Sequence, residues 1–315
     1  MPRRHNPILQ WVLTSICLSF AWVAGRLPLP LSRGFGRFFG RLAYYLIPRI
    51  RGVGLPNLDL AYGDTLAPQE KIRILKEAAE NVGIVAAEFA WISELSGEFL
   101  AQHIACKGIE RLHQGRGSVV VGAHLGNWEW MTTAICASGL PMAEVVRPLD
   151  DARLNAYVDK TRRAKGVVTI AKDGAGREVI QLLRQGWVVA VLIDQSPSKN
   201  AVPVRFFGEP CWGTIAPVMA ALRARVPIYP MAMTRERNGD YTFEVFPEVP
   251  IVRSGDLRRD LIENAQRCQD AVESLVRRWP GQWLWLHRRW KDRPKLDRRW
   301  RAHPARNDDE PKFGS

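Results

Sequence analysis

The 315-residue chain is poor in cysteine, and its cysteines form no recognisable pair. No CxxC motif occurs, and the five cysteines are odd in number and widely scattered, which argues against both a disulfide framework and a zinc cage. A reducing environment on the cytoplasmic side is the simpler interpretation. No G-x-S-x-G motif occurs either, so the chain lacks the serine nucleophile elbow of the α/β-hydrolases. The cysteines are Cys17, Cys106, Cys136, Cys211 and Cys268.

Acidic residues are too few to balance the basic ones. The chain has 45 Lys and Arg against 32 Asp and Glu, which gives a net charge of +13 at pH 7. Such an excess indicates an acidic partner, which is nucleic acid, anionic lipid head groups or an acidic carrier protein. No recognised DNA- or RNA-reading motif accompanies the arginine-rich stretch 277–301. A nucleic-acid-binding protein and a basic membrane scaffold without activity are therefore the non-enzyme alternatives.

The longest stretch without charge lies near the N-terminus. Residues 8–25 contain no charged side chain and follow Arg3 and Arg4. Their number is that of a marginal membrane span, so we expect a retained membrane anchor or an interfacial helix, with a buried core helix as the alternative. No convincing small-x-small cleavage site follows, which disfavours a signal peptide. We expect a membrane-associated helical segment at 1–50, a catalytic domain at 51–300 and a disordered polar tail at 301–315.

From residue 68 onwards, helical and strand-like patterns alternate. Apolar residues recur every three or four positions from Pro68 to about Leu95, which predicts a helix, and another long helix is predicted over 256–278. Short apolar runs between helical patterns predict an α/β fold with a mixed, mostly parallel central sheet flanked by helices. The Pro- and Gly-rich stretch 48–63 is expected to be a connector, and 282–286 to close the sheet. The other predicted strands are 118–121, 144–146, 167–170, 188–193, 228–231 and 241–246.

Three histidines are followed by an acid five residues later, and only one pair has a suitable position. Basic neighbours should lower the basicity of His287, and His303 lies in the polar tail, so we expect both to be solvated or structural. His124 follows an apolar run that ends at Gly122, and a helix is predicted to start near Asn127. Ligands of α/β sheets bind at such strand ends, which favours a catalytic base over a buried core histidine. The pairs are His124/Glu129, His287/Asp292 and His303/Asp308.

The segment HLGNWE, from His124 to Glu129, resembles the H-x4-E signature of the bacterial lipid A late acyltransferases, within the larger group of glycerolipid acyltransferases. Other segments agree with that family in order, and the likeness runs from about residue 10 to about residue 295. It implies a glycerolipid acyltransferase-like fold. The other matching segments are Asn57-Leu58, Arg147-Pro148, Arg162 ahead of Gly166, Asp194-Gln195, Phe206-Phe207-Gly208 with Thr214, and WLWLHRRWK from Trp283 to Lys291.

The resemblance implies an enzyme on the cytoplasmic face of the bacterial inner membrane. It would move a fatty acyl group from a thioester, on acyl carrier protein or coenzyme A, to a hydroxyl of a membrane glycolipid, with no cofactor, metal or covalent acyl-enzyme. The chain reads Asp-Gln-Ser at 194–196 where the lauroyl and myristoyl enzymes often read Asp-Gln-Asp. The alternative is therefore another lipid acceptor, such as a lysophospholipid, a mannosylated lipid or an aminolipid.

The resemblance also assigns roles to single residues. His124 would be the general base and Glu129 would orient its ring. The strand-loop-helix pattern around His124 separately suggests that backbone amides at the helix start face the oxyanion. The alternatives are a structural ion pair for each arginine, a turn residue for Asp194, and core packing for the two phenylalanines of the FFG segment. The substrate-binding candidates are Arg147, Arg162, Asp194, Asn127 and Gln195.

Overall fold

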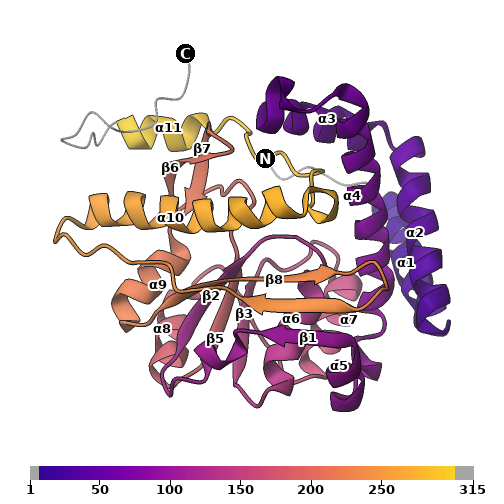
Figure 1. Ribbon diagram of the computed structural model, residues 1–315, viewed down its shortest axis with the longest axis horizontal. Coiled ribbons are helices and arrows are strands. Elements are labelled where there is room, and N and C mark those ends of the chain that lie inside the picture. The colour runs from indigo at the N-terminus through magenta and orange to yellow at the C-terminus, as the bar shows by residue number, and fades with distance from the viewer. Residues whose placement is uncertain (1–6, 302–315) are drawn as a thin grey trace.

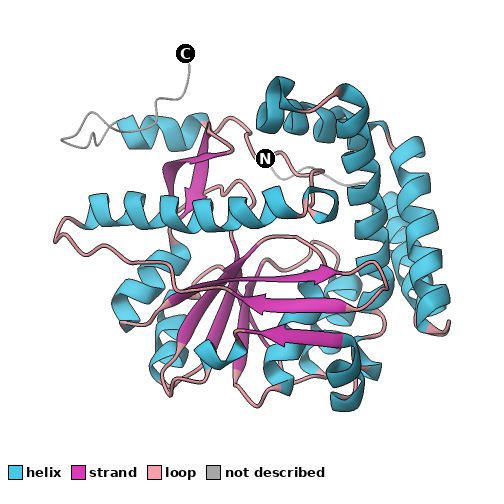
Figure 2. Ribbon diagram, viewed as in Figure 1, coloured by secondary structure: helices cyan, strands magenta, loops and turns pink. Residues whose placement is uncertain are grey.

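A seven-stranded sheet forms the centre of the protein in a computed structural model that describes residues 7–301. The strand order is β1-β9-β8-β2-β5-β3-β4, and only the β8–β9 pair is antiparallel (Figures 1 and 2). The predicted mixed, mostly parallel α/β sheet is therefore confirmed. The strands are β1 (Ile104–Lys107), β2 (Ser118–Gly122), β3 (Met142–Val146), β4 (Val168–Ala171), β5 (Val188–Leu192), β8 (Ile228–Arg235) and β9 (Tyr241–Val245).

Helices cover both faces of this sheet, which explains why its central strand is apolar along its whole length. All five residues of β2 are buried, as expected for a strand with helices on both sides. Val119 and Val121 pack into one core with α8, α9 and α10, while Val120 packs into a second core with α6. The flanking helices are α6 (Trp128–Ala137), α7 (Ala152–Arg163), α8 (Gly176–Arg184), α9 (Ala216–Ala224) and α10 (Leu257–Arg278).

The N-terminal quarter of the described chain is helical and packs against the sheet domain (Figure 1). Helix α2 crosses α4 at glycines, and a Cβ on Gly36 would overlap the backbone of Gly83. The close crossing binds α2 to the longest of these helices, so the described part of the expected N-terminal segment, residues 7–50, packs against the helices that follow it. The helices are α1 (Pro7–Ala24), α2 (Leu29–Leu46), α3 (Pro48–Tyr62) and α4 (Pro68–Phe89).

Two predictions about the path of the chain were wrong. The stretch 48–63 is helix α3, with Pro48 in its first turn, where proline needs no amide hydrogen. Residues 282–286 form no strand, although Trp283 makes an isolated bridge to Leu125. Strand β1 and the hairpin of β6 (Ala201–Phe206) and β7 (Glu209–Thr214) were not predicted. Residues 302–315, which include His303 and Asp308, lie outside the described residues. The remaining elements are α5 (Gly97–His103), α11 (Pro294–Arg301) and short 3-10 turns at 63–65, 92–94, 109–112 and 280–282.

Candidate active site

The loop that carries His124 joins β2 to α6 and is held on both sides by backbone hydrogen bonds. Asn127 caps α6 by accepting from the Trp130 amide at 3.0 Å. Gly126 has a φ of +60°, and a Cβ there would overlap the carbonyl oxygen of Met233 in β8. The Leu284 amide donates to the His124 carbonyl at 3.0 Å. The loop therefore has little freedom to move the imidazole.

Asp194 is the hydrogen-bond partner of the His124 ring. His124 Nδ1 lies 2.9 Å from Asp194 Oδ1, and the His124 amide donates to Asp194 Oδ2 at 3.0 Å. Trp283 Nε1 donates to the same Oδ2 at 2.8 Å. The bond to Asp194 occupies Nδ1 of the ring, so Nε2 is the nitrogen that does not bind Asp194. Asp194 follows β5, which pairs in parallel with β2, so the two strand ends bring together residues 70 positions apart.

Burial and charge act against each other in this pair. Burial opposes ionisation of Asp194, but the charge of His124 and the hydrogen bonds to His124 and Trp283 lower the pKa of Asp194 to about 2. Burial also lowers the pKa of His124, yet the Asp194 carboxylate and its hydrogen bond outweigh that effect, and the pKa of His124 is raised above 6.5. His124 is therefore a stronger base than a free imidazole.

Glu129 is not hydrogen-bonded to His124, which corrects the expected arrangement. Both of its oxygens accept from Arg162, with Nε to Oε2 at 3.0 Å and Nη2 to Oε1 at 2.9 Å, and Trp128 Nε1 donates to Oε1 at 3.0 Å. Glu129 still raises the pKa of His124 through its charge, while Arg162 lowers it. The sequence pointed to Glu129, in the first turn of α6, as the residue that orients the ring. In the structure the hydrogen bond to the ring comes from Asp194, which follows β5.

Arg162 also pairs with a second carboxylate. Its Nε lies 3.1 Å from Oε1 of Glu144 in β3, so one guanidinium faces two acids in a largely buried cluster. Burial raises the pKa of Glu144 to about 7, and Arg162 opposes that rise. This geometry matches the structural ion-pair alternative for Arg162. Its donors Nε and Nη2 are directed at protein carboxylates.

The other substrate-binding candidates occupy different environments. Arg147 is exposed and pairs with Asp150 at 3.0 Å, and within residues 7–301 it makes no hydrogen bond to His124. Asn127 is fully buried, and its amide donates to Glu88 at 2.8 Å while its oxygen caps α6, which corrects the expectation that it contacts substrate. Asp194 is 2% exposed and holds His124, so an acceptor-binding role is also corrected. Gln195 Nε2 lies 3.4 Å from His124 Nε2.

Backbone amides of the loop are already used within the protein. The amides of His124, Gly126, Asn127 and Trp130 donate to Asp194, Gln282, Met233 and Asn127. Those four amides therefore do not form the oxyanion site that the sequence suggested at the helix start.

Glu88 in α4 ties this loop to the N-terminal helices. Its carboxylate is fully buried and binds four donors from four parts of the chain. Two are guanidinium groups, which makes the cluster an ionic one in the interior. The donors are Arg33 Nε at 2.6 Å, Arg235 Nη2 at 3.0 Å, Asn127 Nδ2 at 2.8 Å and the Tyr241 hydroxyl at 2.5 Å.

Comparison with known proteins identifies the family. Residues 3–292 match the family model described as "Bacterial lipid A biosynthesis acyltransferase". The chain belongs to this family. It is therefore an acyltransferase that acts on a lipid acceptor. The resemblance drawn from the H-x4-E segment is confirmed at the level of the family.

The relatives of this acyltransferase are distant but cover most of its length. A "Lipid A biosynthesis acyltransferase" of Haemophilus influenzae is 28% identical over 277 residues, 85% of this chain and 86% of that protein. The "Lipid A biosynthesis lauroyltransferase" of Escherichia coli is 25% identical over 309 residues, 94% of this chain and 97% of that protein. A "Phosphatidylinositol mannoside acyltransferase" of Mycolicibacterium smegmatis is 22% identical over 57% of this chain and 58% of its own.

A solved structure among those that match resembles the acyltransferase weakly. The crystal structure of the 1-acyl-sn-glycerophosphate acyltransferase from Thermotoga maritima matches 78% of this chain and 99% of that chain, with 18% identity and a TM-score of 0.35. At that score the likeness adds no argument to the topology described above.

Segments that the sequence shares with the family, and that lie far apart along the chain, pack together next to the loop of His124. Asn57 Nδ2 donates to the carbonyls of Trp285 and His287 at 2.8 and 2.7 Å, so the first segment holds the last one. Phe206 and Phe207 are buried and pack against Trp283 and Trp285, which matches the core-packing alternative. These segments support the site from behind.

His287, expected to be solvated or structural, lies within electrostatic reach of His124 and Asp194. Burial is the largest cause that lowers the pKa of His287 to about 4, and nearby arginines add to it, so the ring is neutral at pH 7. Its Nδ1 is buried and has no hydrogen-bond partner among residues 7–301. The basic residues beside His287 in the sequence predicted that its pKa would be lowered. That His287 lies close to Asp194 could be seen only in the folded structure.

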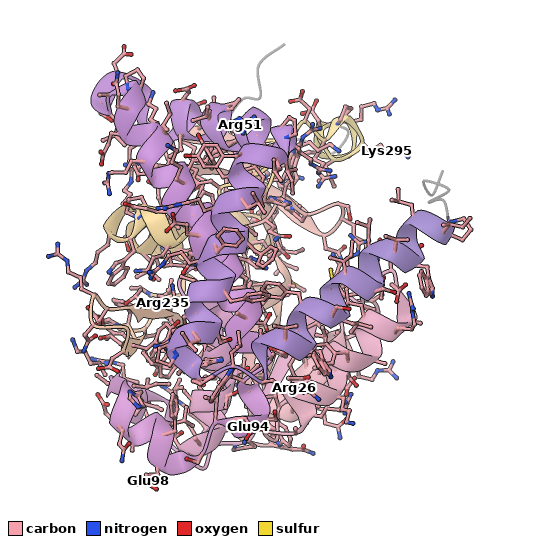
Figure 3. All side chains as sticks on the ribbon, turned by 90° about the vertical axis from the view of Figure 1, so that its right-hand side faces the viewer. Arg26, Arg51, Glu94, Glu98, Arg235 and Lys295 are labelled. Atoms are coloured by element: carbon pink, nitrogen blue, oxygen red, sulfur yellow. The ribbon has the colours of Figure 1, made fainter. Side chains whose placement is uncertain are left out.

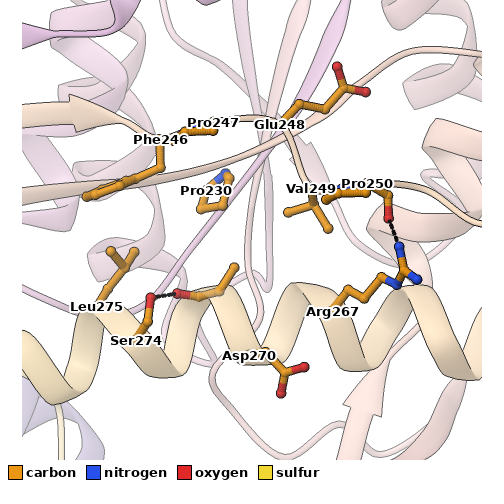
Figure 4. Close-up of a pocket in the computed structure, with 11 residues that line it drawn as sticks. Pro230, Phe246, Pro247, Glu248, Val249, Pro250, Arg267, Asp270, Ser274 and Leu275 are labelled. Carbon is orange, nitrogen blue, oxygen red and sulfur yellow. Dashed lines mark hydrogen bonds between the residues drawn. The ribbon is translucent and has the colours of Figure 1, made fainter.

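A cavity of about 370 Å³ lies between α10 and the segment after β9, far along the chain from His124 (Figure 4). Its walls are largely apolar, and Arg267 Nη1 donates to the Pro250 carbonyl at 2.8 Å beside it. None of the residues that hold His124 lines it, so we assign it no part in the reaction. The labelled lining residues are Pro230, Phe246, Pro247, Glu248, Val249, Pro250, Arg267, Asp270, Ser274 and Leu275.

Proposed function

We propose that this acyltransferase moves a fatty acyl group from a thioester, carried by acyl carrier protein, to a hydroxyl of a membrane glycolipid similar to a lipid A precursor. The proposed place of reaction is the cytoplasmic face of the bacterial inner membrane. The observation that carries the mechanism is the hydrogen bond between His124 Nδ1 and Asp194. It leaves Nε2 to accept a proton, which is what attack by an alcohol requires.

The proposed chemistry is a direct transfer. His124 Nε2 removes the proton from the acceptor hydroxyl while the oxygen attacks the thioester carbonyl, and a C–O bond forms. The tetrahedral intermediate then expels the thiolate as the C–S bond breaks, and the imidazolium returns the proton to sulfur. Asp194 stabilises the imidazolium that exists between the two steps, as the acid of a catalytic triad does.

Two neighbours would support this base in different ways. Glu129 adds negative charge near the imidazolium, and its two bonds to Arg162 hold that carboxylate in place. Gln195, 3.4 Å from His124 Nε2, is the side chain placed to contact a substrate oxygen there. We therefore keep His124, Glu129 and Gln195 in the proposed site and add Asp194 as the residue that orients the ring.

The charge of the protein supports an acidic carrier as the donor. With a net charge of +13, long-range attraction would favour acyl carrier protein over a neutral donor, and that attraction weakens as salt screens it. A mannosylated lipid is the second candidate acceptor. The phosphatidylinositol mannoside acyltransferase among the relatives and the Asp-Gln-Ser sequence at 194–196 favour testing it.

The test is transfer of a labelled acyl group from acyl carrier protein to lipid acceptors by wild type and His124→Ala. We expect His124→Ala to lower turnover by at least about 100-fold, the usual contribution of a positioned base. The matched control is His103→Ala, because His103 also pairs with an aspartate, Asp240 at 2.8 Å, but on the exposed surface. Equal turnover by wild type and His124→Ala would overturn the mechanism.

Mass spectrometry of lipids from cells with and without the gene identifies the acceptor.

A further inference from the structure

Helix α1 is attached to other parts of the protein near both of its ends. Near its start, Arg153 Nη2 in α7 donates to the Trp11 carbonyl at 3.4 Å, and the Arg153 guanidinium lies 5.7 Å from the Trp11 ring centre. At its other end, Trp91 Nε1 donates to the Ala24 carbonyl at 3.1 Å. A helix of this length extends about 27 Å. A helix held at both ends, by α7 and by the segment after α4, lies along the protein surface rather than standing out from it (Figure 3).

The outward side of α1 is apolar, although the helix is docked. Only Thr14 and Ala24 are buried, and the exposed residues are large and hydrophobic. By length and composition α1 could cross a membrane, yet its attachment places this apolar side along the surface. Helix α2 meets α1 at the turn near Arg26 and diverges from it across the face shown in Figure 3, where it adds further exposed apolar residues. The exposed residues are Ile8, Leu9, Trp11, Val12, Leu13, Ile16, Trp22, Leu31, Phe38, Phe39, Tyr45, Leu46 and Ile47.

The charged side chains that α1 and α2 carry themselves are all basic, although Arg37 and Arg41 of α2 share the neighbouring Glu80 of α4. Between residues 7 and 58 there are six arginines and no aspartate or glutamate. Arg37 and Arg41 are exposed on α2, and the Arg26 guanidinium lies 3.8 Å from the ring centre of Trp22. Apolar, aromatic and arginine side chains together match the boundary between acyl chains and anionic head groups. An occupant of this face must offer apolar groups to the exposed side chains and negative charge to the arginines. The acyl chains and head groups of an anionic lipid leaflet offer both together.

We propose that α1 and α2 form an in-plane lipid face, with α1 lying flat in one leaflet of an anionic bilayer instead of spanning it. The inference rests on the proposed function only in that the acceptor is a membrane lipid. Helix α7, which bonds to α1 through Arg153, also carries Arg162 about 13 Å further along its axis, so one helix connects the face with the candidate site. A lipid acceptor reaches His124 from the side of the leaflet.

The first test distinguishes a flat helix from a spanning one. Gln10 Nε2 lies 3.5 Å from the Asp150 carbonyl, so we place cysteines at both positions, Gln10→Cys and Asp150→Cys, after replacing the exposed Cys17 and Cys106 by alanine. In vesicle-bound full-length protein, a short bismaleimide should join the pair. If α1 instead left the protein surface at Ala24 and crossed the bilayer, Gln10 would lie about 21 Å beyond Ala24 along the helix axis. It would then be out of reach of Asp150, and no cross-link would form. Absence of the cross-link in vesicles, with its presence in detergent, would overturn the proposal.

The second test measures binding to vesicles with and without phosphatidylglycerol. The double variant Trp11→Glu with Phe38→Glu should lower binding to anionic vesicles at least ten-fold, and wild type should bind neutral phosphatidylcholine vesicles more weakly. The matched control is Leu257→Glu, because Leu257 is similarly exposed but lies on α10. Unchanged vesicle binding by the double variant, or a change in oligomeric state instead, would assign the face to another occupant.

These tests remain separate from the proposed reaction. His124→Ala should bind vesicles as wild type does, because His124 contributes nothing to the lipid face. Loss of vesicle binding in His124→Ala would contradict that separation. Normal vesicle binding and cross-linking without acyl transfer would overturn the proposed function and leave the lipid face standing.

Discussion

At the scale of single residues, the pair His124 and Asp194 shows what a sequence motif conceals. The apolar run that ends at Gly122 predicted correctly that His124 follows a strand, and the H-x4-E spacing drew attention to Glu129. The fold gives the ring bond to Asp194 and binds Glu129 to Arg162. Nothing in the local sequence distinguishes these arrangements, because the contact of His124 with Asp194 depends on the parallel pairing of β2 with β5.

Replacing Asp194 should change both rate and pH dependence. Asp194 raises the pKa of His124, so Asp194→Asn removes a negative charge and lowers that pKa. Activity requires the neutral imidazole, and it is lost as pH falls through this pKa. The acidic limb of the kcat/KM profile should therefore move to lower pH, while kcat falls at least about 100-fold. A profile with an unmoved limb would contradict the assignment, and Asp240→Asn is the surface control.

Glu144 offers a second pH-dependent test. Because burial raises the pKa of Glu144 to about 7, its carboxyl is largely protonated at pH 6 and ionised at pH 8. The variant Glu144→Gln copies the protonated form. We expect the kcat/KM profiles of wild type and variant to coincide below pH 6 and to diverge above pH 8, where ionised Glu144 competes with Glu129 for Arg162. A difference of equal size at every pH would indicate a packing effect instead.

At the scale of elements, strands and long helices were more predictable than the pieces that hold the site. Strand β2 and the start of α6 follow from a buried apolar run and a capping asparagine. Helix α3 was missed because its prolines and glycines favour loops in isolation, while Asn57 on α3 gains partners only from the 285–287 turn. Tertiary contacts decide such segments, and a single sequence does not show them.

The loop before α6 should tolerate no side chain at Gly126. Gly126→Ala adds a Cβ in a left-handed conformation and against the Met233 carbonyl, which should cost more than about 2 kcal/mol and lower activity with it. The matched control is Gly186→Ala, because Gly186 has a φ of +88° but nothing within 4 Å of its Cβ position. Equal losses of stability in thermal unfolding would show that backbone strain, not the close approach, sets the cost.

At the scale of the whole molecule, the buried carboxylate of Glu88 connects the N-terminal helices, the sheet and the candidate site. It pairs with Arg33 from α2 and Arg235 from β8, and it binds Asn127 at the start of α6. The lipid face proposed above and the loop of His124 therefore share one ionic cluster. Such a cluster is costly to break, because removing one partner leaves buried charge without compensation.

Removing this carboxylate should destabilise the protein strongly. We expect Glu88→Ala to cost about 3 to 5 kcal/mol in the free energy of unfolding, measured by chemical denaturation. The matched control is Glu80→Ala, because Glu80 lies on the same helix and also pairs with arginines, Arg37 and Arg41, at the exposed surface. That variant should lose no more than about 1 kcal/mol. Similar losses in both variants would remove the special role of the buried cluster.

The single nitrogen left open on His124 has a kinetic consequence. With Nδ1 held by Asp194, the same atom must take the proton from the incoming alcohol and deliver it to the departing sulfur. Because the proposed transfer is direct and forms no acyl-enzyme, both substrates must be bound beside that atom before either bond changes. Double-reciprocal plots should intersect rather than run parallel, and a non-acylatable acceptor should trap the donor in a ternary complex.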